Sequence, residues 1–300
     1  MENFACPVCG GDSKECLHDR PDYEYAVPTR LSYHRCSNDH CGLVFANPIP
    51  ISQIPSFYSV YSTHDQQLSG KVTFLSRHAR RIFMREAADT IGGNFEAKIL
   101  DYGCGSGQFL NELSDAGFKN LTGYDFDQKA REAARSSGAH VVDDEDELTA
   151  MGSFDVITMN HVIEHLVDPI TSLSRLSCLL NPGGRIIIRT PNARSALSRV
   201  LGAAWRGWET PRHLHVFTPK SIDKIMLLPE LAHLITSRVG TSNAMFFGMF
   251  HESFRHLVWA SGGGKIVRHL LAFSSFGILS LINYAHEGLG EELVVELRIE

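Results

Sequence analysis

Short apolar runs alternate with amphipathic stretches from Ala97 to the end of the chain. Short apolar runs bounded by turn residues indicate buried strands, and apolar positions at helical spacing indicate the helices that cover them. The predicted strands are Lys98–Tyr102, Leu121–Asp125, His140–Val142, Asp155–Met159, Arg185–Arg189, Leu234–Val239 and Leu293–Ile299. The predicted helices are Gln108–Ala116, Gln128–Ser136, Pro169–Leu180 and Pro219–Leu227. This alternation predicts βαβ units and an α/β fold with a mostly parallel sheet.

The first 95 residues follow a different pattern. Residues 1–50 are rich in cysteine and turn residues, show no helical period and end in Asn47-Pro48-Ile49-Pro50. Residues 51–95 begin as a loop, become helical and stop at Gly92-Gly93. We therefore expect a small module at 1–50, a helical connector at 51–95 and an α/β domain at 96–300.

Composition and charge narrow the functional classes. The 300 residues are 43% hydrophobic and 21% charged with a net charge of −6, which is typical of a globular protein and unfavourable for binding a phosphate backbone. The sequence contains no stretch of about 20 apolar residues, which is the length that a helix needs to span a bilayer. The N-terminus is polar, without the basic and apolar regions of a secretory signal, so we expect a cytoplasmic protein that does not bind nucleic acid.

The segment 245–286 is aromatic and apolar, and carries little charge. We expect it to form a helical cover over the substrate pocket, which favours a small, apolar or lipid-like acceptor. The uncharged stretch Leu270–Tyr284 follows Lys265 and Arg268, so residues 265–286 are also a candidate for peripheral membrane contact.

Five of the seven cysteines lie within the first 41 residues. Cys6 and Cys9 form one closely spaced pair, and Cys36 and Cys41 form a second, wider pair. Four thiolates in two turns are typical of a tetrahedral structural zinc site. His40 or Cys16 could replace one ligand. Residues 1–50 contain four basic and seven acidic residues, which argues against a nucleic-acid-binding zinc ribbon.

A glycine-rich turn follows the strand that ends in Asp101-Tyr102. The sequence Gly103-Cys104-Gly105-Ser106-Gly107 lacks the extra residue of the dinucleotide fingerprint. Asp101 would repel a pyrophosphate but attract an ammonium group. Asp125, at the end of the next strand, can accept both hydroxyls of a ribose. The ligand implied has a ribose and a cationic amino-acid tail, and S-adenosylmethionine fits this description.

These residues resemble the first two motifs of class I S-adenosylmethionine-dependent methyltransferases. Further segments are similar in the same order, namely Ser153–Ile157, Asn160–Pro169, Leu180–Gly184, Thr190–Asn192 and Pro211–Thr218. The subgroup most resembled contains the ubiquinone-biosynthesis O-methyltransferases, and many relatives carry an N-terminal zinc knuckle. The resemblance implies a Rossmann-like fold with a seven-stranded, mostly parallel sheet whose last strand is antiparallel.

The resemblance also implies roles for individual residues. Asp101 and the glycines of the turn (Gly103, Gly105 and Gly107) would hold the methionyl tail, and Asp125 the ribose. Phe126 would flank the adenine, Asp144 would lie near the adenine amine, and Asn160 would line the methionyl side.

Methyl transfer to oxygen often needs a base, and histidine titrates near neutrality. His161, Glu164, His165, His213 and His215 fall where relatives place groups that face the acceptor. His165 is our first candidate for the base and His213 the second. His161 stands where the ubiquinone-type relatives carry an acidic residue linked to a divalent ion, so metal-assisted methylation does not follow from the resemblance.

The predicted function is methylation of a small molecule, most simply on oxygen. A sugar C-methyltransferase with an N-terminal zinc module and a non-catalytic cofactor-binding scaffold are the alternatives. The intact acidic and glycine residues of the cofactor motifs argue against the scaffold.

Overall fold

The computed structural model describes residues 4–58, 84, 87, 89–242 and 289–299. The expected segment 245–286, with the candidate membrane contact 265–286, lies outside these residues. The chain divides into two compact units. Unit 1 comprises Met1–Pro50, Pro191–Lys224 and Gly240–Leu293, and unit 2 comprises Ile51–Thr190, Ile225–Val239 and Val294–Glu300. Residues 1–50 thus share a compact unit with residues 191–224.

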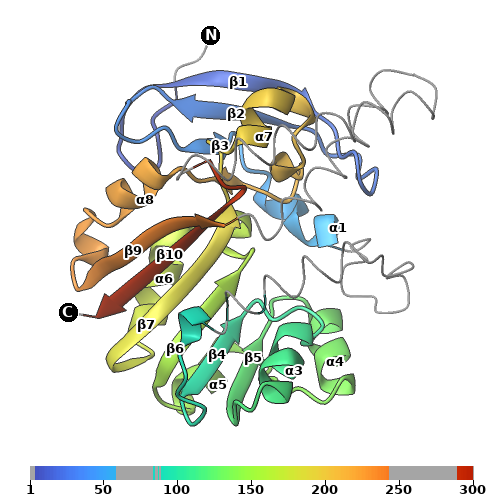
Figure 1. The fold of residues 1–300 in the computed structure, drawn as a ribbon. Helices are drawn as coiled ribbons and strands as arrows, with labels where there is room; N and C mark the ends of the chain where they lie inside the picture. The colour runs from blue at the N-terminus through green and yellow to red at the C-terminus, as the bar shows by residue number, and fades with distance from the viewer. Residues whose placement is uncertain (1–3, 59–83, 85–86, 88, 243–288, 300) are drawn as a thin grey trace, which may run out of the picture. The chain divides into compact units, whose positions relative to one another are not determined.

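A six-stranded sheet carries the α/β fold (Figure 1). Its order is β5 (Asn120–Tyr124), β4 (Lys98–Tyr102), β6 (Phe154–Asn160), β7 (Leu180–Pro191), β10 (Glu292–Ile299) and β9 (Leu234–Ser242). Strands β5, β4, β6 and β7 are parallel, and the last strand, β10, runs antiparallel to its neighbours, as expected. The Rossmann-like fold class is therefore confirmed.

The prediction of a seventh strand in this sheet is wrong. Residues His140–Val142 form only an isolated bridge, in which Val141 pairs with Gly123. The next residues turn away because the Asp143 amide donates to Glu147 Oε2 at 2.8 Å and Asp144 caps the following helix. Pairing with β5 therefore stops after this one bridge, and residues 140–142 do not form a strand.

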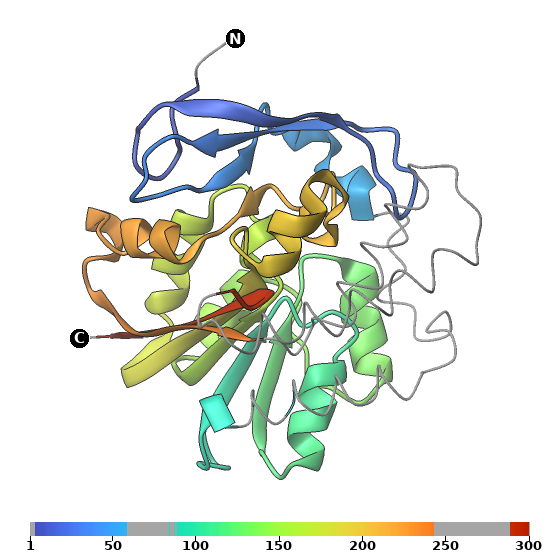
Figure 2. The same cartoon turned by 45° about the horizontal axis from the view of Figure 1, so that its top comes forward.

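Helices flank the strands of unit 2. They are α1 (Ile54–Tyr58), α3 (Gln108–Asp115), α4 (Gln128–Ser136), α5 (Glu145–Ala150) and α6 (Pro169–Ser177). Three of them (α3, α4 and α6) were predicted from the sequence, whereas α1 and α5 were not. In Figures 1 and 2, α3 and α4 lie beside β5. Asp127 and Asp168 cap α4 and α6 by accepting backbone hydrogen bonds, which fixes where these helices begin. Helix α6 ends three residues earlier than predicted, because Leu180 already pairs with Phe154 in the sheet.

Unit 1 is built on a second sheet, in the order β1 (Ser13–Arg20), β2 (Leu31–Cys36), β3 (Val44–Ala46) and β8 (His215–Val216). Helices α7 (Ala196–Leu201) and α8 (Pro219–Ile225) also lie within its range. The sheet is not confined to residues 1–50, since Phe45 on β3 pairs with His215 on β8. The Tyr33 hydroxyl, fully buried, lies 2.9 Å from the His213 carbonyl oxygen, to which it donates.

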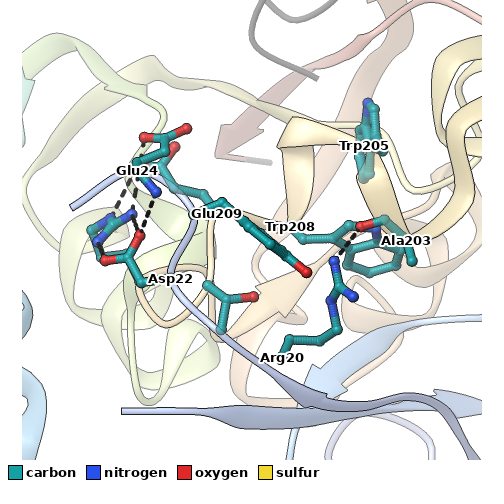
Figure 3. A pocket seen from close by; sticks show the side chains of 10 residues that line it. Arg20, Asp22, Glu24, Ala203, Trp205, Trp208 and Glu209 are labelled. Atoms are coloured by element: carbon teal, nitrogen blue, oxygen red, sulfur yellow. Dashed lines mark hydrogen bonds and ion pairs between the residues drawn. The ribbon is translucent and has the colours of Figure 1, made fainter. Parts of the chain in front are cut away.

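A buried ion-pair cluster joins the first 50 residues of unit 1 to the segment after β7 (Figure 3). Arg212 is 1% exposed and donates to both carboxylate oxygens of Asp22, at 2.8 and 3.3 Å. Glu209 accepts from Arg212 at 3.2 Å and pairs with Arg206 at 2.8 Å, and Arg206 also pairs with Glu24 at 2.9 Å. Burial raises the pKa of Asp22, but the hydrogen bond and positive charge of Arg212, together with hydrogen bonds from the backbone of Glu24 and Tyr25, outweigh burial and lower the pKa.

Four members of this cluster line a small pocket in unit 1 together with Trp205, Trp208 and Arg20; they are Asp22, Glu24, Glu209 and Arg212. Figure 3 shows the side chains of Glu24, Asp22 and Glu209 on one side and those of Trp205 and Arg20 on the other. The Arg20 guanidinium donates to the Ala203 carbonyl at 2.6 Å, which is a second link between the N-terminal residues and the later segment. Among the described residues, no helix has the length and apolar character needed to cross a membrane.

We predict that Arg212→Met lowers the free energy of unfolding by about 3–5 kcal/mol, because it leaves the carboxylates of Asp22 and Glu209 buried without their guanidinium. Arg30→Met is the matched control: Arg30 pairs with Asp19, both about half exposed, and its loss should cost about 1 kcal/mol or less. Urea denaturation followed by tryptophan fluorescence measures both. Equal effects of the two variants would contradict the role of the cluster.

The lowered pKa of Asp22 also predicts the direction of a pH effect. A carboxyl group whose pKa is lower in the folded state stabilises the fold above its unfolded pKa of about 3.9. That contribution is lost as the pH falls through the folded value. Acidification below about pH 4 should therefore destabilise the wild type more than an Asp22→Asn variant, measured by urea denaturation across this range.

Candidate functional site

The glycine-rich turn joins β4 to α3 in unit 2. Gly103, Gly105 and Gly107 all have positive φ angles, of 84°, 54° and 77°. A Cβ at Gly103 would lie 2.3 Å from Val162 Cγ2, so only glycine fits there. The amides of Gly103 and Cys104 both donate to the Tyr124 carbonyl oxygen at 2.7 and 2.9 Å, which ties the end of β4 to the end of β5.

Asp101 lies at the end of β4, just before this turn, and is 2% exposed. Its Oδ1 accepts a hydrogen bond from Thr158 Oγ1 at 2.7 Å and another from Asn160 Nδ2 at 3.3 Å. Thr158 faces Asp101 because the two residues pair in the parallel register of β4 and β6. The structure thus brings together Asp101 and Asn160, two of the predicted site residues, and adds Thr158, which sequence reasoning missed.

Asp125 follows β5 and is buried. Its Oδ2 accepts from the Gly105 amide at 2.8 Å, and its Oδ1 accepts from the Asp127 amide at 2.9 Å. These two bonds fix the carboxylate beside the glycine turn. A carboxylate can accept about four hydrogen bonds, so about two acceptor positions of Asp125 remain, which is enough for the two hydroxyls of a ribose. The arrangement therefore fits the ligand that the motifs imply.

Phe126 presents an aromatic surface next to Asp125. Its side chain is half exposed, and its ring lies edge-on to the rings of Tyr102 and Tyr124, with centroids 5.2 and 5.5 Å away. Tyr102 is held in turn by a hydrogen bond to Glu145 Oε1 of 2.6 Å. An exposed ring supported by two others is suited to flank a planar base.

Asp144 occupies a different kind of position. It is exposed, and its Oδ1 accepts from the Glu147 amide at 2.8 Å as the N-cap of α5. This hydrogen bond explains its place at the start of the helix. Its role near the adenine amine stays a prediction.

The two histidines predicted as bases have different surroundings. His165 is partly buried, and its Nδ1 lies 3.2 Å from the hydroxyl of Tyr58, which α1 supplies. His213, in unit 1, is buried, with Nδ1 2.8 Å from the Gly207 carbonyl and Nε2 3.5 Å from Glu209. Both ring nitrogens of His213 therefore have structural partners. His165 lies on the 3-10 helix Ile163–His165, which follows the end of β6 at Asn160. The catalytic role of either histidine stays a prediction.

The four predicted zinc ligands gather in unit 1. Cys6, Cys9, Cys36 and Cys41 are free thiols whose Sγ atoms all lie within 4.8 Å of one another. The Cys6–Cys41 and Cys9–Cys36 sulfur distances are 3.8 and 3.4 Å. Sulfurs about 2.3 Å from a tetrahedral Zn²⁺ lie about 3.8 Å apart, so this donor set fits zinc.

The turns around these sulfurs support the same reading. Gly10 and Gly42 follow the two cysteine pairs, and both adopt φ of 68°. The sulfur contact with Cys41 lowers the pKa of Cys6 to about 5, so the cluster already favours one thiolate. The alternative ligands are not in the group: the Cys16 thiol donates to the Tyr33 carbonyl at 3.4 Å, and His40 is exposed.

Comparison with known proteins agrees with these features. A family model described as "Methyltransferase domain" matches residues 72–228, which is just over half of the chain. The ubiquinone biosynthesis O-methyltransferase of Aromatoleum aromaticum is 29% identical over 185 residues, covering 58% of this chain and 76% of that protein. The enzyme of the same name from Thiobacillus denitrificans is 35% identical over 129 residues, covering 39% of this chain. The match spans only 55% of that relative.

Similar solved structures are more distant. The plantazolicin methyltransferase BpumL, in complex with SAH, is 18% identical with a TM-score of 0.48, covering 82% of this chain and 93% of that one. A methyltransferase of Thermotoga maritima, described as a possible histamine N-methyltransferase, is 18% identical with a TM-score of 0.47, covering 76% of this chain and 97% of that one. The family match, the sheet order and the Asp101–Asp125 site agree. The chain belongs to the methyltransferase-domain family, which confirms the resemblance to S-adenosylmethionine-dependent methyltransferases seen in its motifs.

Proposed function

We propose that the protein methylates a hydroxyl group of a small, apolar acceptor, with S-adenosylmethionine as the methyl donor. The observation that carries the proposal is the pair of carboxylates, Asp101 and Asp125, fixed on either side of the glycine turn at the carboxyl ends of β4 and β5. In open α/β sheets ligands bind outside these strand ends. The names of the relatives favour oxygen as the methylated atom.

The residues of unit 2 would act on this cofactor in distinct ways. The buried Asp101 carboxylate, oriented by Thr158 and Asn160, would bind the ammonium of the methionyl tail. Asp125 would accept the two ribose hydroxyls, and Phe126 would cover one face of the adenine. When bound, S-adenosylmethionine supplies an electrophilic methyl group on its sulfonium.

Methylation of a hydroxyl also needs a group that removes the proton. A histidine close to the carboxyl end of β6 meets this need, because imidazole changes its charge near neutral pH. His165, on the 3-10 helix Ile163–His165, is the base favoured by the sequence, and Tyr58 restrains its ring. The apolar nature of the acceptor rests on the aromatic composition of residues 245–286.

The cysteine cluster would hold one structural Zn²⁺ in this proposal. The ion would cross-link the turn at Cys6–Cys9 with the turn at Cys36–Cys41, on either side of the β1–β2 hairpin. Four protein ligands leave no open coordination position, so the ion would stabilise the fold rather than take part in methyl transfer. The acidic balance of residues 1–50 agrees with a structural module.

We predict that Asp125→Ala weakens binding of S-adenosylmethionine by about 2 kcal/mol or more, roughly thirtyfold in Kd, because two charge-assisted hydrogen bonds to the ribose are lost. Isothermal titration calorimetry measures the change. Asp127→Asn is the matched control, since it removes a nearby charge and keeps an N-cap residue on α4. Unchanged affinity in Asp125→Ala would remove Asp125 from the site.

We also predict about one zinc ion per chain, measured by plasma mass spectrometry on protein purified without chelator. Cys36→Ser should lose the ion and lower the unfolding temperature, because metal binding contributes directly to the folding of such modules. Cys16→Ser should keep the ion, since its sulfur lies outside the cluster. A wild-type chain without zinc, or equal zinc content in the two variants, would overturn the assignment.

A further inference from the structure

Glu164 is a fully buried carboxylate that the proposed function has not used. It lies on the 3-10 helix after β6 and is 0% exposed. Its Oε2 accepts a hydrogen bond from Thr190 Oγ1 on β7 at 2.9 Å, and its Oε1 lies 3.3 Å from Nδ1 of His161. A buried carboxylate is costly unless it is paired. The imidazole of His161 is a partner that can direct an Nδ1–H group toward this carboxylate.

His161 occupies a strained and well-defined position. Its φ is 56°, in the left-handed region that non-glycine residues rarely adopt, and its amide donates to the Arg189 carbonyl oxygen at 2.8 Å. It directly follows Asn160, whose side chain reaches Asp101. The side chain of His161 is 29% exposed. Such strain persists where the surrounding structure enforces it, and it often marks functional sites.

The partner of Nδ1 decides which nitrogen of an imidazole can act as a base. An ionised carboxylate only accepts hydrogen bonds, so Glu164 favours the proton on Nδ1 of His161 and leaves the lone pair on Nε2. The Glu164 carboxylate beside Nδ1 therefore prepares His161 to remove a proton through Nε2.

We propose that His161 is the general base of the methyl transfer, with Glu164 as its positioning residue; this rests on the proposed O-methylation. The proton of the acceptor hydroxyl passes to Nε2 of His161, and the O–H electron pair stays on the oxygen, which becomes the nucleophile. The resulting imidazolium is stabilised by the Glu164 carboxylate, which Thr190 holds in place. In this proposal His165 does not remove the proton, so its loss does not distinguish acceptors that need a base from acceptors that do not.

The kinetic test compares two probe acceptors, catechol and 4-nitrocatechol, with labelled S-adenosylmethionine and the full chain at slightly alkaline pH. Nitrocatechol is already largely ionised there, so it needs no base. His161→Asn, which tolerates the left-handed backbone, should slow turnover of catechol about 100-fold or more, and that of nitrocatechol less than about tenfold. Glu164→Gln should lower kcat for catechol with little change in cofactor affinity. Exogenous imidazole should partly restore His161→Ala.

Two controls separate this pattern from a structural effect. His18→Asn removes an exposed histidine that pairs with Glu15 at 2.8 Å, and it should leave both rates unchanged. His165→Asn should slow both acceptors alike. The proposal is overturned if His161→Asn slows both acceptors equally, or if the catechol-selective loss belongs to His165→Asn.

A second measurement does not depend on the acceptor. Nitrogen-15 NMR of histidine-labelled wild-type protein reports the tautomer of His161, whose signal is the one missing from His161→Asn. In the neutral ring, a proton on Nδ1 supports the proposal, and a proton on Nε2 overturns it. If neither phenol is methylated by a wild-type chain that binds S-adenosylmethionine, O-methylation of phenols fails as the function. The tautomer then still decides whether Glu164 prepares His161 as a base.

Discussion

Two hydrogen bonds hold the candidate cofactor site together. The Tyr124 carbonyl oxygen accepts from the amides of both Gly103 and Cys104, so the chain leaving β4 must turn directly over the end of β5. This turn sets Asp101 and Asp125 beside the same loop, although 23 intervening residues separate them in the sequence. The positive φ at Gly103 and its close approach to Val162 are the local conditions that permit it. The positions of the two carboxylates, of Phe126 and of the segment after β6 all depend on this turn, which ties the end of β4 to the end of β5.

Much of unit 2 could be predicted from the sequence because its signals are local. Strands β4, β5 and β6 are largely buried runs. Helices α4 and α6 begin at the aspartate caps Asp127 and Asp168, and α3 begins directly after the glycine-rich turn. The contact of Thr158 with Asp101 depends on the register between β4 and β6, and this register cannot be derived from the sequence of either strand. A threonine two residues before the end of a strand, level with an aspartate, is the only signal that could have indicated it.

Unit 1 was harder to predict, and the reasons are physical. Most of strand β1 is exposed, and its pairing with β2 shifts register twice, so no alternation of apolar and polar residues reveals it. The ion pairs of Asp22 and Arg212 join residues 190 positions apart, and their charges read as ordinary surface residues in the sequence. The cysteine cluster was predictable because zinc ligands need a fixed spacing, whereas the contact of Tyr58 with His165 has no such signature.

The pairing of β3 with β8 has a consequence for the order of folding. Phe45 meets His215 across a loop of about 170 residues, and this loop contains most of unit 2. Closing so long a loop is entropically unfavourable unless the intervening chain has already condensed. During synthesis, strands β1 to β3 would therefore be made before unit 2. The edge of β3 that pairs with β8 would stay unpaired until residues 215–216 are made. Strand β3 is thus made before unit 2 but obtains its second neighbour only after most of unit 2 has been made.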